Sequence, residues 1–179
     1  KVCYEFKETT LGDPNFNNIN IDQILSDSFI EKLISKINFD KVYSSKNLYV
    51  TSNPETVYLT VVDRDLNAVS FINSICHVFG SGITTANSGI LFQNRGVNFR
   101  LEKNHPNCIE GGKRPLHTII PGLLTNANNE TILSYGVMGG QYQPIGQSHV
   151  LQNIIDYNLN IQEALDLPRA FALDNNLKV

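Results

Sequence analysis

The chain has 179 residues, of which 41% are hydrophobic and 17% charged, and its formal net charge is −3. This length and composition suit a globular core and differ from those of a disordered chain. The negative charge and the lack of a long basic run argue against a nucleic-acid-binding protein. No apolar stretch approaches the roughly 18 residues that span a bilayer, so we expect no membrane segment in this chain.

The cysteines Cys3, Cys76 and Cys108 are odd in number and contain no C-x-x-C pair. This spacing argues against a zinc ribbon or a dithiol centre and favours free thiols. Free thiols favour a cytoplasmic, reducing compartment. The histidines lack the spacing of a helical metal-binding motif, so we expect neither a metal nor another cofactor. The first residues do not resemble a signal peptide, but the chain starts without methionine, and we expect it to be a fragment.

Apolar and polar residues alternate along the chain in patterns that predict an α+β fold, with helices covering an antiparallel sheet. We expect a loop over residues 1 to 19 and a helical region over 21 to 37, broken near 26 to 28. A capping box is predicted to begin at Ser28. Residues 39 to 54 are rich in Lys, Ser and Asn and are predicted to form a solvated linker.

The second part of the chain is predicted to be rich in hairpins. Strands are expected over 57 to 63 and 68 to 74, joined by a tight turn, with shorter strands over 88 to 93, 116 to 120 and 131 to 135. A helix is expected from about 145 to 159. A second, short helix is predicted to begin at Asn160 and to end before Pro168.

Thr56 is the first candidate for chemistry, because it lies directly before a predicted strand and after an exposed linker. Cleavage of the chain before Thr56 would place a hydroxyl nucleophile and an α-amine base on one residue. The α-amine has a reference pKa of about 7.7–8.0, which suits a base near neutral pH. The structural alternative is an ordinary threonine at a strand edge.

Other candidates depend on Thr56. Gly139 and Gly140 could direct two successive backbone N–H groups at a developing oxyanion, or simply form a strand-to-helix turn. Ser74 ends the second strand of the predicted hairpin, where its hydroxyl could orient Thr56 or be merely solvated. His117 and Thr118 could line an acyl pocket or be merely structural. Arg95 is a further candidate, whose structural alternative is a solvated loop charge.

Together these residues resemble the γ-glutamyltransferase family of N-terminal-nucleophile enzymes, which cleave glutathione and related amides. The resemblance covers nearly the whole chain in family order. Its motifs are Leu11-Gly12-Asp13-Pro14, Thr56 through Asp63, Phe79-Gly80-Ser81-Gly82-Ile83, Ser88-Gly89-Ile90-Leu91, Gly112-Lys113-Arg114-Pro115, Gly139-Gly140, Asp156-Tyr157-Asn158-Leu159-Asn160, Glu163-Ala164 and Pro168-Arg169.

The resemblance implies an αββα four-layer sandwich, in which residues 1 to 55 end the large subunit and residues 56 to 179 form the small-subunit catalytic domain. It also implies autoproteolysis of the Glu55–Thr56 bond and attack by Thr56 on a γ-glutamyl carbonyl. Water or an acceptor amine would resolve the acyl-enzyme. Gly139 and Gly140 correspond to the oxyanion hole and Ser74 to a supporting hydroxyl. The implied partners are the rest of the large subunit, which supplies a substrate-binding arginine, and a small-molecule amide; family members are often secreted or periplasmic.

Several residues depart from the family pattern. Val57 replaces a threonine after the nucleophile, and His117-Thr118 replaces two serines that contact the glutamyl carboxylate. Cys76, Arg95 and Asn98 stand where the family has Asn, Gln or Glu, and Asp around the glutamyl amino group. A cation there should repel an ammonium group. The alternatives are therefore an enzyme for amine-free acyl groups such as glutaryl, similar to the cephalosporin acylases, and a catalytically silent relative.

Overall fold

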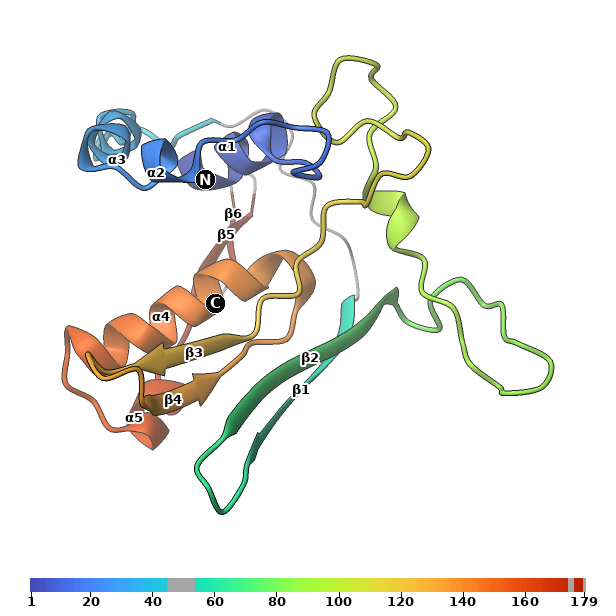
Figure 1. The fold of residues 1–179 in the computed structure, drawn as a ribbon. Helices are drawn as coiled ribbons and strands as arrows, with labels where there is room; N and C mark the ends of the chain where they lie inside the picture. The colour runs from blue at the N-terminus through green and yellow to red at the C-terminus, as the bar shows by residue number, and fades with distance from the viewer. Residues whose placement is uncertain (45–53, 174–175, 179) are drawn as a thin grey trace. The chain divides into compact units, whose positions relative to one another are not determined.

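The computed structural model describes residues 1–44, 54–173 and 176–178. Most of the predicted linker over 39 to 54 therefore lies outside the described residues. Helices and two-stranded sheets both occur, which confirms the predicted α+β class (Figure 1). In chain order the elements are α1 (Val2–Thr10), α2 (Ile21–Ile24), α3 (Asp27–Ile34), β1 (Pro54–Val62), β2 (Ala68–His77), η1 (Arg95–Asn98), β3 (Gly122–Thr125), β4 (Thr131–Tyr135), η2 (Gly140–Tyr142), α4 (Gln143–Ile155), α5 (Ile161–Asp166), β5 (Phe171–Leu173) and β6 (Asn176–Lys178).

The chain divides into two compact units, and neither is continuous in sequence. The first unit contains residues 1–50, 96–117 and 172–178, and the second contains 51–95, 118–171 and the last residue. This division by packing differs from the boundary that the sequence predicts at Thr56, which concerns the expected processing of the chain. Segments from both sides of that boundary therefore pack together within the first unit.

The second unit is built on two antiparallel hairpins, β1–β2 and β3–β4. The first hairpin turns where the Asp63 carboxylate accepts the backbone N–H groups of Asp65 and Asn67, both at 2.9 Å. A hydrogen bond from the Asn67 side-chain amide, and then these backbone bonds, lower the pKa of Asp63. In the second hairpin Asn126 has the same function, since its side chain accepts from two backbone N–H groups of the turn. Both turns use an Asx geometry that satisfies the backbone locally.

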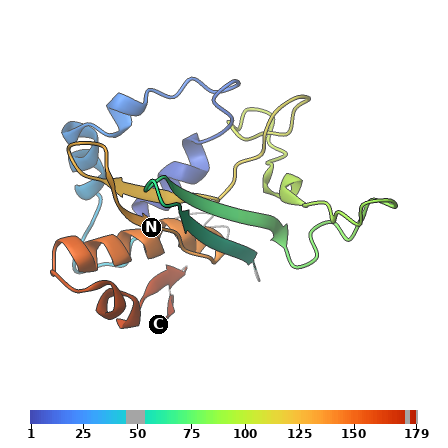
Figure 2. The ribbon, with the colours of Figure 1, turned by 60° about the horizontal axis from the view of Figure 1, so that its bottom comes forward.

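Helix α4 lies along the β3–β4 hairpin in two views (Figures 1 and 2). Its buried Gln147 donates a hydrogen bond of 2.5 Å to the carbonyl of Ile120, which ties the helix to the segment entering β3. Helix α5 then begins at Asn160, as predicted, with a capping box in which Asn160 and Glu163 exchange hydrogen bonds of 2.9 and 3.0 Å. The fully buried Ala164 packs this short helix on α4.

The first unit contains the three N-terminal helices. Phe6 of α1 meets Phe29 of α3 edge to face, with ring centroids 5.1 Å apart. Side chains that accept the first free N–H groups cap two of the helices, Asn20 for α2 and Ser26 for α3. The helical region over 21 to 37 and its break are thus confirmed, but the cap is Ser26 rather than Ser28.

Three element predictions are wrong. Residues 2–10 form α1 rather than a loop, because tertiary contacts stabilise a segment with several poor helix formers. No strand forms over 88 to 93, where the structure has a single bridge between Thr84 and Leu91, and Gly89 has a left-handed φ of 67°. Residues 116 to 120 are irregular, and the strand begins instead at Gly122, where the Tyr135 ring lies too close for a Cβ.

Candidate active site

Thr56 lies in β1 at an irregularity of the β1–β2 hairpin. Glu55 pairs with Cys76 whereas Val57 pairs with Asn73, so β2 contains one extra residue opposite Thr56. Ser74 is one of the two β2 residues at this bulge. The structure therefore brings Thr56 and Ser74 to facing positions on adjacent strands, the arrangement that the hairpin pattern predicts. Bulges re-aim side chains and are frequent beside active sites.

The bulge forces an unusual backbone at Cys76, which is buried and has a φ of 79°. A left-handed φ is uncommon for a residue with a Cβ and is kept only where its surroundings determine it. Here the Cys76 N–H donates to the Ser74 hydroxyl at 3.1 Å. Ser74 thus stabilises the bulge opposite the candidate nucleophile with its own side chain.

Arg95 also contacts this bulge, since its guanidinium donates to the Ser74 carbonyl at 3.3 Å. The residue is 9% exposed, which rules out a solvated loop charge. Within the part of the chain that the structure describes, no carboxylate lies at ion-pair distance from Arg95. The preceding turn is held by Asn94, whose amide bonds the backbone and ring of His77 at 3.1 and 2.9 Å. A buried cation is therefore held against the strand that pairs with Thr56.

Gly139 and Gly140 follow β4 and have φ values of 120° and 56°. Both angles lie where residues with a Cβ are strained, so the backbone favours glycine at both positions. Gly140 is buried and begins η2, which contacts β1. The structure thus brings the glycine pair close to the strand that carries Thr56.

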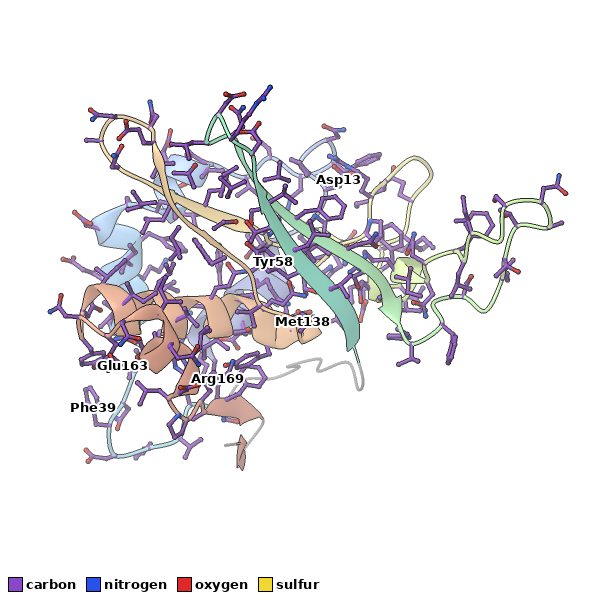
Figure 3. The ribbon with its side chains drawn as sticks, turned by 90° about the horizontal axis from the view of Figure 1, so that it is seen from below. Asp13, Phe39, Tyr58, Met138, Glu163 and Arg169 are labelled. Atoms are coloured by element: carbon purple, nitrogen blue, oxygen red, sulfur yellow. The ribbon has the colours of Figure 1, made fainter. Side chains whose placement is uncertain are left out.

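A cluster of hydroxyl groups joins the β1–β2 hairpin to the end of β4, and the sequence patterns do not reveal it. The Tyr58 hydroxyl lies 2.7 Å from that of Ser134, which also accepts from Thr60 at 2.8 Å. Ser70 donates to the Tyr58 oxygen at 3.2 Å. The Tyr58 ring, labelled on its hairpin in Figure 3, lies against Gly136. The alternation of these polar residues along paired strands is the one signal that could have indicated a shared face.

The acyl-pocket candidates are divided between the two units. Thr118 belongs to the second unit. There the amide nitrogen of the fully buried Gln143 faces two backbone carbonyls and donates to that of Thr118 at 2.6 Å and to that of Val137 at 3.2 Å. Asn98 and His117 belong to the first unit. The Asn98 amide donates to the Leu116 carbonyl at 3.0 Å.

The described residues contain no group of three His, Cys, Asp or Glu side chains placed to hold a metal ion. None of the described helices is long and apolar enough to cross a membrane.

The sequence pattern of the γ-glutamyltranspeptidase family matches residues 1–179. The chain belongs to this family. The chain is 35% identical over 169 residues to the glutathione hydrolase-like YwrD proenzyme of Bacillus subtilis and 32% identical over 169 residues to the oxamate amidohydrolase proenzyme of Klebsiella pneumoniae. Each alignment covers 94% of this γ-glutamyltranspeptidase-family chain and 31% of the relative. The chain thus spans about a third of the length of these curated relatives.

Solved structures give the same family relationship. The crystal structure of cephalosporin acylase from Bacillus halodurans superposes with a TM-score of 0.82 at 39% identity, over 97% of this chain and 31% of that one. The γ-glutamyltranspeptidase from Pseudomonas nitroreducens complexed with L-DON superposes with a TM-score of 0.60 at 27% identity, over 65% of each chain. The names of both curated relatives describe them as proenzymes.

Proposed function

We propose that Thr56 is the nucleophile of an amide hydrolase or acyltransferase that matures by cleavage of its own Glu55–Thr56 bond. The observation that carries this proposal is the placement of Thr56 opposite the Ser74 bulge, on a strand that contacts the glycine turn at Gly140. Attack of the Thr56 hydroxyl on the Glu55 carbonyl would convert the peptide bond into an ester. Water would then hydrolyse the ester, which leaves the Glu55 carboxylate and a free Thr56 α-amine.

The mature residue then performs acyl transfer. The Thr56 oxygen attacks the substrate amide carbonyl, and the α-amine accepts the hydroxyl proton and passes it to the departing amine. The backbone N–H groups of Gly139 and Gly140 stabilise the negative oxygen of the tetrahedral intermediate. Ser74 orients the nucleophile through the bulge. Water or an acceptor amine releases the acyl group and restores Thr56.

The γ-glutamyl group of glutathione and related amides is the leading acyl donor, by membership of the family. A second candidate is an acyl group that bears a carboxylate but no amine, such as glutaryl, and Arg95 favours it. A buried guanidinium would pair with a carboxylate and repel an ammonium group. The names of two similar proteins, oxamate amidohydrolase and cephalosporin acylase, are compatible with this candidate. The other residues proposed to contact the acyl group are Cys76, Asn98, His117 and Thr118.

The proposed assembly is a heterodimer of the large subunit, ending at Glu55, and a small subunit that starts at Thr56. The four-layer αββα arrangement is proposed for the assembled protein. A catalytically silent relative that binds without turnover is the competing possibility.

Maturation is tested by mass spectrometry of the full-length protein. The wild type is expected to yield a product beginning at Thr56, and Thr56→Ala is expected to remain intact and inactive. Thr131→Ala, at an exposed strand position, is the matched control and should cleave normally. An intact wild-type chain, indistinguishable from Thr56→Ala, would refute the proposal in favour of the silent relative.

The acyl donor is tested with matched glutaryl and γ-glutamyl anilides. If Arg95 contacts the acyl group, as the second candidate requires, we expect γ-glutamyl turnover to be weak and Arg95→Gln to lower kcat/KM for the glutaryl substrate. Loss of a hydrogen bond to a charged group costs about 1.5–3 kcal/mol, which corresponds to roughly 10- to 150-fold. Arg64→Gln is the control, because its side chain is 94% exposed. Equal turnover of both substrates by the wild type would exclude the role assigned to Arg95.

A further inference from the structure

The first unit contains chain from both sides of the proposed cleavage site, because it joins residues 1–50 to residues 96–117. Asp13, in the loop after α1, provides the tightest of these links (Figure 3). Its carboxylate accepts the Arg114 backbone N–H at 2.8 Å and the Arg114 guanidinium at 3.2 and 2.9 Å. The Asp13 side chain is 1% exposed. A two-pronged ion pair with an added backbone bond is a geometrically specific contact.

The backbone around Asp13 is shaped for this contact. Gly12 lies against the carbonyl of Pro106, and a Cβ on Gly12 would come within 2.8 Å of the Pro106 carbonyl carbon. Only glycine allows the two segments to approach so closely. The Asp13 carboxylate also accepts the backbone N–H of Asn15 at 3.1 Å, which holds its side chain in place. The buried Lys113 ammonium lies 5.3 Å from the centre of the Phe16 ring.

Glu8 of α1 forms a second link. Its carboxylate pairs with Arg100 at 2.9 Å, and its backbone carbonyl accepts Nε2 of His105 at 2.7 Å. The Nδ1 atom of His105 in turn accepts the backbone N–H of Asn107 at 3.0 Å. These partners fit an imidazole ring that donates from Nε2 and accepts at Nδ1.

The link from Glu8 continues to a residue of the proposed acyl pocket. Asn107 is 2% exposed, and its amide donates to the Asn98 carbonyl at 2.7 Å and accepts the Leu116 N–H at 3.1 Å. Because Asn98 itself bonds the Leu116 carbonyl, Asn107 closes a ring of hydrogen bonds. Residues before the cleavage site thereby order the backbone that carries Asn98.

We propose that these contacts form a clasp that retains the N-terminal cleavage product on the catalytic product and orders the segment carrying Asn98. The clasp consists of Glu8 and Asp13 on one product and Arg100, His105 and Arg114 on the other. The partner that this surface fits is the remainder of the same precursor. The inference rests on the proposed cleavage at Glu55–Thr56, since an uncut chain needs no clasp to stay together.

Electrostatics favour a clasp that persists over the working pH range. Arg114 and the backbone N–H groups hold the pKa of Asp13 far below its ordinary value. A depressed carboxyl pKa stabilises the folded state at pH values above the ordinary carboxyl pKa of about 3.9, and that stabilisation is lost as the pH falls through the lower folded value.

The experiment is hydrogen exchange with mass spectrometry on the cleaved full-length protein, combined with size-exclusion chromatography in increasing urea. Asp13→Asn should raise exchange over residues 106–116 about tenfold or more and release the N-terminal product at lower urea. Exchange in β4 should stay unchanged. Asp40→Asn, in an exposed loop, is the matched control. Arg100→Gln tests the Glu8 link independently and is available if Asp13→Asn fails to fold.

Wild-type exchange and retention in both variants would overturn the clasp. If the Glu55–Thr56 bond stays intact, the proposed function fails, but the clasp is still testable. Cutting the chain at a protease site inserted between residues 45 and 53 would also separate Glu8 and Asp13 from Arg100, His105 and Arg114. Hydrogen exchange and retention in urea then test the clasp as before.

Discussion

Gly136→Ala is the sharpest test of how the fold places Thr56, the proposed nucleophile, relative to the glycine turn. A Cβ on Gly136 would lie 2.6 Å from Cε2 and 2.9 Å from Cγ of Tyr58. Gly136 does not have a positive φ, so alanine adds a steric conflict without backbone strain. The aromatic ring is rigid, and either β1 or the segment leading to Gly140 must move. Overpacking of this kind costs about 1–3 kcal/mol.

If this cost falls on the transition state, kcat drops about 5- to 150-fold, since ~1.4 kcal/mol is tenfold in rate. The assay is kcat and KM for the better anilide substrate, together with the rate of precursor cleavage. Gly111→Ala is the control, because a Cβ at Gly111 meets only open space. Adding Tyr58→Leu to Gly136→Ala should restore part of the rate. A Gly136→Ala enzyme with wild-type kcat and cleavage would refute the reasoning that Tyr58 sets this spacing.

Three further substitutions test the site and its support. Tyr58→Phe removes the hydroxyl bonded to Ser134 and should lower the free energy of unfolding in urea by about 1 kcal/mol. Tyr157→Phe, at an exposed position, is the control and should leave that free energy unchanged. Equal effects of the two substitutions would contradict the hydroxyl cluster. Asn160→Ala removes the capping box of α5 and should lower the free energy of unfolding by about 1 kcal/mol in the same assay. An unchanged free energy of unfolding would show that the cap does not contribute to stability. Gly140→Ala places a Cβ on a residue with a φ of 56°, and the backbone strain costs about 1–2 kcal/mol. The substitution should lower kcat rather than raise KM. An effect on KM alone would argue against an oxyanion role for Gly140.

Local sequence signals predicted the elements that local interactions determine. The hairpin around Asp63, the start of α5 at Asn160 and the break between α2 and α3 all depend on residues within four positions of one another. Helix α1 was missed because its stability comes from contacts such as Glu8 with Arg100, 92 positions away. Long-range partners leave no periodic trace in a single sequence.

The same distinction applies to the site. The hairpin pattern places Thr56 opposite Ser74, because pairing within a hairpin follows from strand lengths. The bulge at this pair was not predictable, because it brings a φ of 79° at Cys76 that no local sequence signal indicates. Burial of Arg95 was equally hidden, because a charged residue in a turn is ordinarily solvated and only the fold encloses it.

Strand pairing on the two sides of Thr56 bears on the proposed cleavage. Among the described residues, which resume at 54, Pro54 and Glu55 pair with β2 before Thr56, and six register pairs from Val57 to Val62 follow it. Proline has no N–H to donate, so Pro54 contributes no donor to the pairing before Thr56. If the Glu55–Thr56 bond is cut as proposed, the six pairs from Val57 to Val62 still hold Thr56 on β2. Glu55 lies opposite Cys76, a proposed acyl contact. Separation of Glu55 from Cys76 would expose the hydrogen-bonding edge of β2 beside the proposed α-amine, so the pairing that remains keeps the nucleophile in place through the proposed maturation.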